Sequence, residues 1–351
     1  MALEPTPVLV FACDRPAYLG RALGSIFRNE DEPGRRIFVS QDGTDESVSA
    51  VVRQFGSPVE HLSFTGPVRT EDNIRYKNDP SSIGFFRIAQ HYGWAFRELF
   101  DNRGLESLII LEDDLEISPD FFNYFRAAAK MMGHDPTIWT VSSWNDNGYS
   151  SRVEDPERLL RTDFFPGLGW LMTRALWDEV RDGWPPTYWD DWFRRPERRK
   201  GRSVIYPEIS RVYNFGREGT SGPAFFDHHL KAIKSTDTPI DFTKLDLGYL
   251  IRERYDAALD EAMAAARLVD RTDLPATPDG DVKVLYHGEA SFDELATHFG
   301  LLTGFRDAGL PRCSYRGVVS FRDHGRRMHL VPLSYLAGDE IAGLRAGKTG
   351  R

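Results

Sequence analysis

Three consecutive carboxylates, Glu112, Asp113 and Asp114, directly follow the apolar run SLIIL. Carboxylates at the end of a buried strand repel one another and lose hydration unless a cation or a polar ligand compensates. A hard divalent cation that bridges a diphosphate needs only one or two of them, because phosphate oxygens and water complete its coordination. The spacing is equally consistent with a metal site and with a solvated acidic turn that caps the helix starting at Ser118.

A second acidic pair, Asp190 and Asp191, lies inside the segment Trp189–Trp192. Seven of the eight tryptophans fall within residues 139–192, several of them beside Gly, Pro or Asp. Aromatic ring faces can pack on the C–H faces of sugars while carboxylates and amides bind the hydroxyls. Most of these tryptophans, including Trp177, are expected to fill a core, but two acids flanked by rings indicate a sugar site.

The elements that must position these groups alternate between strand and helix, which predicts an open and mostly parallel α/β sheet. Apolar runs predict strands, and Pro at a first helical turn or apolar residues at helical spacing predict helices. We expect strands at 7–12, 36–40, 107–111 and 138–142, and helices beginning at Pro16 and spanning 45–55, 81–100 and 120–132, the last capped by Ser118.

Polar residues follow three of the predicted strands at the point where each strand ends. Asp14-Arg15 follows the first strand, Gln41-Asp42-Gly43 the second, and the acidic triplet the run SLIIL. Ligands of doubly wound sheets bind at the carboxyl ends of the strands. We therefore expect the three polar clusters to converge on one site.

Composition excludes several classes of function. A formal charge of −9 argues against a nucleic-acid partner, and the basic run 194–202 reads as a solvated surface strip. The longest apolar runs, 8–12 and 108–111, are far shorter than the roughly 20 residues of a membrane span, and no signal peptide is visible. Only two cysteines, Cys13 and Cys313, are present, which favours a reducing compartment.

The C-terminal third carries fewer signals. Residues 236–244 and 274–281 have the Pro, Thr and Asp content of linkers, and 256–269 is expected to be a helix. Residues 282–332 are expected to form a small α+β unit. Within that unit, 322–329 (RDHGRRMH) is expected to be a hairpin turn with a solvated face, with an acceptor-side basic patch as the alternative.

Several long motifs together resemble one family, the glycoprotein β-1,2-N-acetylglucosaminyltransferase I family, with the protein-O-mannose β-1,2-N-acetylglucosaminyltransferases as its nearest relatives. The match runs in order from about Val8 to about Pro332. The motifs are LIILEDDLEISPDFFNYF, TVSSWNDNG, LLRTDFFPGLGWLMTRALW, YWDDWFRRPERRKGR, PEISRVYNFGREGTSGPAFFDHHLK and YRGVVSFRDHGRRMHLVP.

The resemblance implies a GT-A fold, that is, a Rossmann-like, mostly parallel open sheet, with a smaller α+β C-terminal domain. It implies that residues 1–216 form the catalytic domain, 217–252 a closing loop and linker, and 253–345 the small domain. The implied reaction is Mn²⁺-dependent, inverting transfer of GlcNAc from UDP-GlcNAc to the 2-hydroxyl of a terminal mannose in a glycan or glycoside acceptor.

By the same resemblance, the acidic triplet binds the donor and its metal. The motif implies that Asp114 is the direct Mn²⁺ ligand, while Glu112 and Asp113 contact the GlcNAc and the ribose. Arg15, in CDRP, is similar to the residue that meets the nucleotide near its phosphates. Ser221, in GREGTSG, is similar to a phosphate-contacting serine on a loop that orders over bound nucleotide.

The remaining assignments concern the uracil and the acceptor. Asp42, in SQDG, and His91, in AQHYGWA, are similar to the uracil contacts, although His91 taken alone reads as a helix-packing histidine. Asp190 matches the catalytic base, and Trp189 is expected to contact the donor sugar. Asp191 is then expected to be a structural acid that holds the loop to Arg194 or Arg195.

The sequence also departs from the family. Cys13 matches a family cysteine whose partner position is Gly43, and the other disulfide positions are Thr140 and Val204. These losses favour a cytoplasmic protein of bacterial type, with the Golgi lumen as the alternative for a chain that has lost its membrane anchor. Other acceptors, other UDP-sugars, hydrolysis of a nucleotide sugar and sugar binding without catalysis remain the competing hypotheses.

Overall fold

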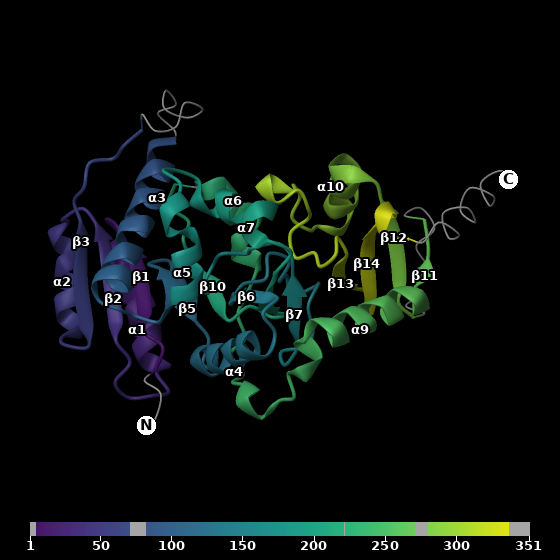
Figure 1. The fold of residues 1–351 in the computed structure, drawn as a ribbon, viewed down its shortest axis with the longest axis horizontal. Coiled ribbons are helices and arrows are strands. Elements are labelled where there is room, and N and C mark those ends of the chain that lie inside the picture. Colours follow the sequence, from purple (N-terminus) through teal and green to yellow (C-terminus); the bar gives the residue numbers. More distant parts are fainter. Residues whose placement is uncertain (1–4, 71–81, 221, 271–279, 337–351) are drawn as a thin grey trace, which may run out of the picture.

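The structure is a computed structural model that describes residues 5–70, 82–220, 222–270 and 280–336 of the 351-residue chain. Its elements lie along one long axis, with a parallel sheet and its helices at the N-terminal end and a smaller sheet at the C-terminal end (Figure 1). The predicted fold class, a mostly parallel open α/β sheet followed by a smaller α+β unit, is confirmed.

The largest sheet has the strand order β3-β2-β1-β4-β8. Strands β1 to β4 run parallel, and β8 pairs antiparallel with β4 at one edge. The strands are β1 Val8–Ala12, β2 Ile37–Asp42, β3 Val59–Phe64, β4 Ser107–Glu112 and β8 Trp170–Thr173. Because β1, β2 and β4 are parallel, their carboxyl ends lie at one edge of the sheet. The strand order changes direction between β1 and β4, which is where ligands of such sheets bind.

Helices cover both faces of this sheet. They are α1 Pro16–Arg28, α2 Glu46–Phe55, α3 Ile83–Phe96 with the π-helical turn η2 Arg97–Asn102, α4 Phe121–His134 and α5 Arg174–Val180, followed by the turn η3 Arg181–Gly183. All five residues of β1 are buried. Successive side chains of a strand point to opposite faces, so β1 contributes to two apolar clusters, one on each side of the sheet.

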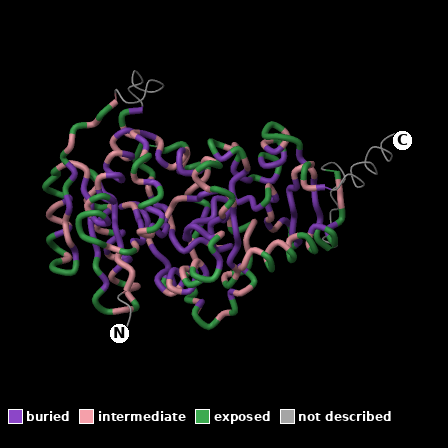
Figure 2. The backbone as a smooth tube through the Cα atoms, in the orientation of Figure 1, coloured by how far each residue is buried: buried purple, intermediate pink, exposed green. Residues whose placement is uncertain are grey.

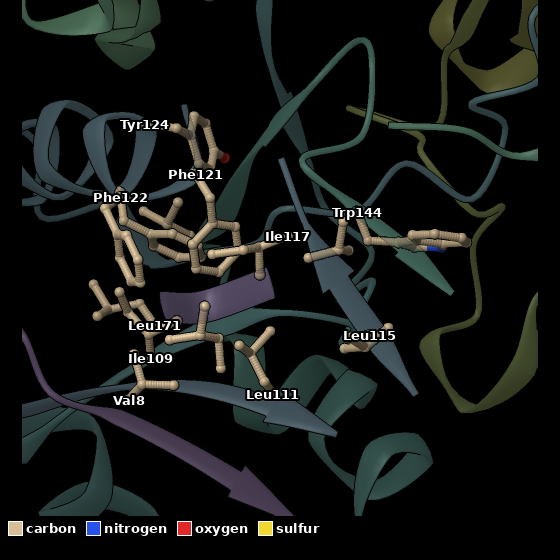
Figure 3. Packing of buried hydrophobic residues seen from close by; sticks show 14 of the residues in the cluster. Val8, Ile109, Leu111, Leu115, Ile117, Phe121, Phe122, Tyr124, Trp144 and Leu171 are labelled. Carbon is tan, nitrogen blue, oxygen red and sulfur yellow. The ribbon is translucent and has the colours of Figure 1, made fainter. Parts of the chain in front are cut away.

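Figure 3 shows one of these clusters, in which strand residues pack against the aromatic face of α4. Val8 of β1 and Ile109 of β4 lie beside Phe121 and Phe122, and all four are at most 2% exposed. Burial of each such side chain contributes roughly 1.5–3 kcal/mol. This packing fixes β1 and β4, and with them the residues that follow each strand.

A second layer of short strands extends the molecule beyond β8. It contains the sheet β6-β9-β7 and the pair β10-β5. The elements are β5 Leu115–Ile117, β6 Ile138–Val141, β7 Leu159–Thr162, α6 Trp189–Arg194, α7 Pro196–Arg199, β9 Ser203–Pro207, β10 Val212–Asn214, α8 Pro223–His228 and the turns η4 Leu230–Ala232, η5 Phe242–Lys244 and η6 Gly248–Leu250. Thr140 lies directly opposite Val204 in the β6–β9 pair.

The C-terminal unit contains α9 Arg252–Ala265, β11 Arg267–Leu268, β12 Val282–Tyr286, α10 Gly288–Phe299, η8 Arg306–Ala308, β13 Val319–Asp323, β14 Arg326–Pro332 and η9 Leu333–Tyr335. Its strand order is β11-β12-β14-β13, and it has an apolar cluster of its own. The tube in Figure 2 is mostly buried along the strands, whereas much of α9 is exposed. The division of the chain at residues 216 and 252 stays a prediction.

Several predicted boundaries were wrong. Ser118 does not cap α4: the helix begins after Asp120, and the Ser118 hydroxyl donates to the Asp120 carboxylate at 2.6 Å. Asp120 is fixed there by the buried Arg211, 3.0 Å away, so the turn is longer than the Ser-Pro signal indicates. The helix expected at 256–269 runs from Arg252 to Ala265, because the chain then pairs with β12.

Two more predictions need correction. The strand β3 was not expected, since its sequence VEHLSF mixes polar and apolar residues, as suits its place at the sheet edge. The hairpin within 322–329 exists, but its face is not solvated: Arg326, Arg327 and His329 are 6%, 8% and 2% exposed.

The helix predicted at 81–100 and the linker predicted at 274–281 each lie partly outside the described residues. Among the described helices, none has the length and apolarity needed to cross a bilayer.

Candidate active site

The acidic triplet lies where β4 ends. Glu112 is the last residue of β4, and the next backbone N–H, that of Asp113, donates to the carbonyl of Phe11 in β1 at 2.9 Å. Asp113 and Asp114 are only 1% and 8% exposed. Burial raises the pKa of Glu112 and of Asp113 to about 7 and also raises that of Asp114. Such a cluster strongly favours bound positive charge.

Arg15, directly after β1, supplies part of that charge. Its guanidinium contacts both carboxylate oxygens of Asp113, with Nε 3.3 Å from Oδ2, and its Nη1 lies 3.2 Å from Oδ2 of Asp114. The pKa of Arg15 is raised: burial opposes its charge, but the carboxylates of Asp113 and Asp114 outweigh burial. The predicted convergence of the β1 and β4 clusters is confirmed.

Asp114 lies against the chain that leaves β10. Asn214 Nδ2 is 3.5 Å from Asp114 Oδ1, and the backbone N–H of Phe215 donates to the carbonyl of Asp114 at 3.0 Å. A Cβ at Gly216 would stand 2.1 Å from Asp114 Oδ2, so only glycine leaves room for this carboxylate. Among the described residues, no group of three or more His, Cys, Asp or Glu side chains is spaced to hold a metal on its own.

The next residues of the predicted closing loop extend over Arg15. Arg15 Nη1 donates to the carbonyl of Glu218, and a Cβ at Gly219 would be 3.3 Å from the same nitrogen. Thr220 lies against Gly84 at the start of α3. Segment 216–220 therefore connects the end of β10 to the rim of the site, and the predicted Ser221 lies outside the described residues.

A second group of predicted residues lies at the end of β2. Asp42 accepts two hydrogen bonds from Arg87 of α3, at 2.8 and 2.6 Å. His91, one turn further along α3, is 4% exposed and has Nε2 2.7 Å from the Ser40 hydroxyl, with its ring stacked on Phe64. Burial lowers the pKa of His91 to about 4, so the imidazole is neutral at pH 7. The sequence motifs did not single out Arg87, although its spacing from His91 places both on one helix face.

Trp189 at the start of α6 lies in a stack of rings. Its ring stacks on Tyr92 at 4.7 Å and on Trp170 at 5.6 Å, and Tyr92 in turn stacks on Phe11 at 3.6 Å. The Tyr92 hydroxyl donates to Glu112 Oε1 at 2.7 Å. Tyr92 thus joins the acidic triplet to α6, a role that sequence spacing did not reveal. Trp177 is fully buried, which confirms its expected place in the core.

Asp190 and Asp191 share one buried guanidinium. Arg194 Nη1 lies 2.7 Å from Asp190 Oδ2 and 2.9 Å from Asp191 Oδ1, while its Nε donates to the carbonyl of Phe165 at 3.0 Å. Burial alone would raise the pKa of Asp190, but the charge and hydrogen bond of Arg194 hold it below its usual value. The carboxylate is therefore ionised at neutral pH.

The expected link between Asp191 and Arg194 is confirmed, but Arg194 is not part of a solvated basic strip. Its side chain is 6% exposed, because the acids of the same helix turn and the ring of Phe164, 4.8 Å from the guanidinium, enclose it. Arg195, the next residue, pairs with Asp307 at the surface. The basic run therefore divides into one buried side chain, Arg194, and others that are half-buried or, at Lys200, exposed.

The ends of β1, β2 and β4 thus carry Arg15, Asp42 and the acidic triplet along one sheet edge, and Tyr92 connects that edge to α6, the helix that carries Asp190. This fold and this site define a glycosyltransferase of the GT-A class, the class expected from the sequence. The chain belongs to the GNT-I family, whose sequence model matches residues 1–341.

One relative is the alpha-1,3-mannosyl-glycoprotein 2-beta-N-acetylglucosaminyltransferase of Arabidopsis thaliana. It is 41% identical over 333 residues, which are 92% of this chain and 73% of the relative. The family resemblance seen in the motifs is therefore confirmed.

Solved structures offer more distant likenesses. TarS residues 1–349 of S. aureus in complex with UDP-GlcNAc is 12% identical, with a TM-score of 0.38 over 62% of this chain and 61% of that chain. The galactosyltransferase LgtC with donor and acceptor sugar analogues is 18% identical, with a TM-score of 0.28 over 49% of this chain and 59% of that chain. Likenesses this weak carry no argument about the ligands of this chain.

Proposed function

We propose that this chain transfers GlcNAc from UDP-GlcNAc to the 2-hydroxyl of a terminal mannose, with inversion at the anomeric carbon. The observation that carries the proposal is the placement of an ionised carboxylate, Asp190, beside the acidic edge formed by the end of β4. Burial is the main cause of the raised pKa of Glu112, and the negative charge of Asp190 also contributes to it, so the two groups lie near each other. Family membership and the 41% identical transferase support the donor and the linkage.

The residues around Asp114 fit a divalent cation held jointly with a diphosphate. Asp114 is a single buried carboxylate whose raised pKa reflects burial, and one or two protein carboxylates suffice when phosphate oxygens and water complete the shell. We take Mn²⁺ as the ion and Asp114 as its protein ligand. When bound, such an ion stabilises negative charge on a diphosphate leaving group.

The donor would lie along the ends of the strands. Arg15 would bind the phosphates, since its guanidinium already lies at the mouth of the acidic cluster. Asp42 and His91 would bind uracil, one as an acceptor fixed by Arg87 and the other as a neutral imidazole fixed by Ser40. Glu112 and Asp113 would accept hydrogen bonds from sugar and ribose hydroxyls, and Ser221 would contact the phosphates.

Asp190 would accept the proton of the mannose hydroxyl as that oxygen attacks the anomeric carbon. General-base assistance of this kind contributes typically about 10²–10⁴-fold in rate. Arg194 keeps the carboxylate ionised and holds it in place, and Trp189 anchors the start of α6 in the aromatic stack. The attacking oxygen would arrive on the face opposite the departing diphosphate, which gives inversion.

We also propose a reducing compartment, the cytoplasm, as the place of action. Cys13 and Cys313 are both free, Gly43 stands at the family's partner position for Cys13, and Thr140 faces Val204 without a sulfur atom on either. Recovery of the protein in the cytosolic fraction of its own cells tests this proposal. Recovery from the Golgi lumen would contradict it.

Asp190→Asn is the test of the function. In the presence of Mn²⁺, the variant should bind UDP-GlcNAc within a few-fold of the wild type and lose acceptor-stimulated release of UDP. An equal loss of donor binding and turnover would make Asp190 a donor-site residue. Release of free GlcNAc that does not depend on any acceptor would identify a nucleotide-sugar hydrolase. Absence of Mn²⁺-dependent donor binding in the wild type would favour a sugar-binding protein.

A further inference from the structure

The C-terminal unit contacts the helix that carries Asp190. The short turn η8, at residues 306–308, packs against α6 and lies beside it in Figure 1. Two ion pairs cross this contact. Arg306 Nε lies 3.4 Å from Asp191 Oδ1, and Arg195 makes two hydrogen bonds to Asp307 Oδ2, at 2.9 and 2.8 Å. Asp191 of α6 thus meets a cation of η8, and Arg195, the C-cap residue of α6, meets an anion of η8.

The pair of Arg306 and Asp191 belongs to a series of alternating charges that ends at Asp190, the proposed base. Arg306 contacts Asp191, Asp191 contacts Arg194 at 2.9 Å, and Arg194 contacts Asp190 at 2.7 Å. Exposure falls from 49% for the Arg306 side chain to 17% for Asp191 and 6% for Arg194, and it rises again to 36% for the Asp190 side chain at the end of the series. Ion pairs gain strength as solvent is excluded. The buried pair of Asp191 and Arg194 is therefore stronger than a surface pair, and it links the position of Asp190 to the position of Arg306.

The backbone is strained on both sides of this contact. Tyr188, immediately before α6, has φ 45°, and Arg306 has φ 52°, although neither residue is glycine. Left-handed conformations of non-glycine residues cost on the order of 1 kcal/mol or more and persist where the surroundings determine them. Tyr188 fixes the direction in which α6 leaves the preceding loop, and Arg306 directs its own side chain at Asp191.

We propose that the C-terminal unit positions the catalytic base: Arg306 holds Asp191, and Asp191 shares Arg194 with Asp190. The inference rests on the proposed function and assigns Arg306, Asp191 and Arg194 as positioning residues for that reaction. The Arg195–Asp307 pair fixes the same helix from its other end. The small unit is therefore part of the catalytic apparatus even though it supplies no group that touches the reacting atoms.

The sharing of Arg194 has an electrostatic consequence for Asp190. The charge of Asp190 interacts with Arg194 of α6, Arg306 of η8, Glu112 of β4 and Tyr92 of α3, and its carboxylate also accepts from the backbone of Asp191. Loss of the Asp191 charge leaves Arg194 to Asp190 alone and lowers the pKa of Asp190. Loss of the Arg306 charge raises the pKa of Asp190, because Arg306 is one of the cations that lower it.

The test compares Arg306→Ala, Arg306→Lys and Asp191→Asn with the wild type in acceptor-stimulated UDP release across a range of pH. Arg306→Ala should lower kcat roughly 10- to 100-fold, as expected for a misplaced base, and leave the UDP-GlcNAc affinity within a few-fold. Arg306→Lys should recover part of the loss. The acid limb of the kcat profile should move to higher pH in Arg306→Ala and to lower pH in Asp191→Asn.

The matched control is Arg316→Ala. Arg316 also belongs to the C-terminal unit, has φ 52°, is 41% exposed and pairs with one aspartate, Asp260, at 2.9 Å. Because the ion pairs and hydrogen bonds of Arg316 to described residues go to Asp260 and Asp163 and not to α6, its variant should keep the wild-type kcat and pH profile. A second test exchanges the charges of the Arg195–Asp307 pair. Arg195→Asp alone should lower kcat, and the double variant that also carries Asp307→Arg should restore it.

The outcomes separate this inference from the proposed function. If the wild type does not transfer GlcNAc to any mannoside, the proposed function fails. If the wild type transfers GlcNAc but Arg306→Ala and Asp191→Asn match Arg316→Ala in kcat and in pH profile, only the inference is overturned. Acid limbs that move in the same direction in both variants would also overturn it, because opposite charges were removed.

Discussion

Asp114 and Gly216 occupy complementary space: a Cβ added at Gly216 would stand 2.1 Å from Oδ2 and 2.6 Å from Cγ of the Asp114 carboxylate. The carboxylate follows β4 and the glycine follows β10, so two segments about a hundred residues apart meet at the proposed metal ligand. No larger residue fits at position 216 without moving either the acid or the chain that leads into the closing loop.

We therefore predict that Gly216→Ala weakens Mn²⁺-dependent UDP binding at least tenfold, because the added methyl group must displace the Asp114 side chain. Titration calorimetry with Mn²⁺ and UDP measures the effect. The control is Gly133→Ala in α4, where no described atom beyond the adjoining residues and the helix's own backbone lies within 4 Å of the added Cβ, and the substitution should stabilise the helix by roughly 0.5–1 kcal/mol. Unchanged UDP binding in Gly216→Ala would contradict the assignment of Asp114.

Arg87 fixes Asp42 by a two-point hydrogen bond, and this predicts a loss of donor affinity when Arg87 is shortened. Arg87→Ala should lower the affinity for UDP roughly tenfold, since a hydrogen bond to a charged group contributes about 1.5–3 kcal/mol. Arg53→Ala serves as the control, because Arg53 pairs with the exposed Glu46 on α2. Equal affinities in the two variants would show that Asp42 does not bind the nucleotide in the orientation that Arg87 gives it.

The buried His91 predicts a pH dependence of stability. Its pKa is lowered by burial from 6.5 to about 4, so between these values the unfolded chain binds a proton that the folded chain does not. The free energy of unfolding should therefore fall as the pH drops from 6.5 to 4, by on the order of 3 kcal/mol from this residue. The stability is fully present above pH 6.5.

Urea unfolding of the wild type and of His91→Gln at pH 7 and pH 4.5 checks this prediction. The variant should lose less stability than the wild type between the two pH values, whatever its stability at pH 7. Replacement of the exposed His324 by Gln should leave the difference as in the wild type. The same pH dependence in His91→Gln and the wild type would contradict a neutral, buried imidazole.

The parallel sheet could be predicted from the sequence because its central strands are continuous apolar runs. Val8–Ala12 and Leu108–Leu111 are buried on both faces. Such strands can be predicted from their own apolar sequence, without knowing which strands they pair with. The edge strand β3 has polar residues on its exposed side and was missed. The start of α4 was misplaced because the contact of Asp120 with Arg211 joins residues far apart in the sequence.

The residues of the candidate site also divide into those that the sequence predicts and those that it does not. Arg15, Asp42 and the acidic triplet lie directly after strands, so the topology alone brings them together. Arg87 and Tyr92 lie on α3 and act through contacts with Asp42 and Glu112 that no local spacing encodes. The charge chain from Arg306 to Asp190 joins residues more than a hundred positions apart, and only the packing of η8 on α6 reveals it.

The proposed transfer is best checked by the product formed from UDP-GlcNAc, Mn²⁺ and a mannose-terminated glycoside, analysed by NMR together with the amount of UDP released. Inverting transfer should give a GlcNAc residue joined β-1,2 to the mannose in a one-to-one ratio with UDP, and no such product with Asp190→Asn. Free GlcNAc in place of a glycoside, or a product with retained anomeric configuration, would contradict the proposed transfer.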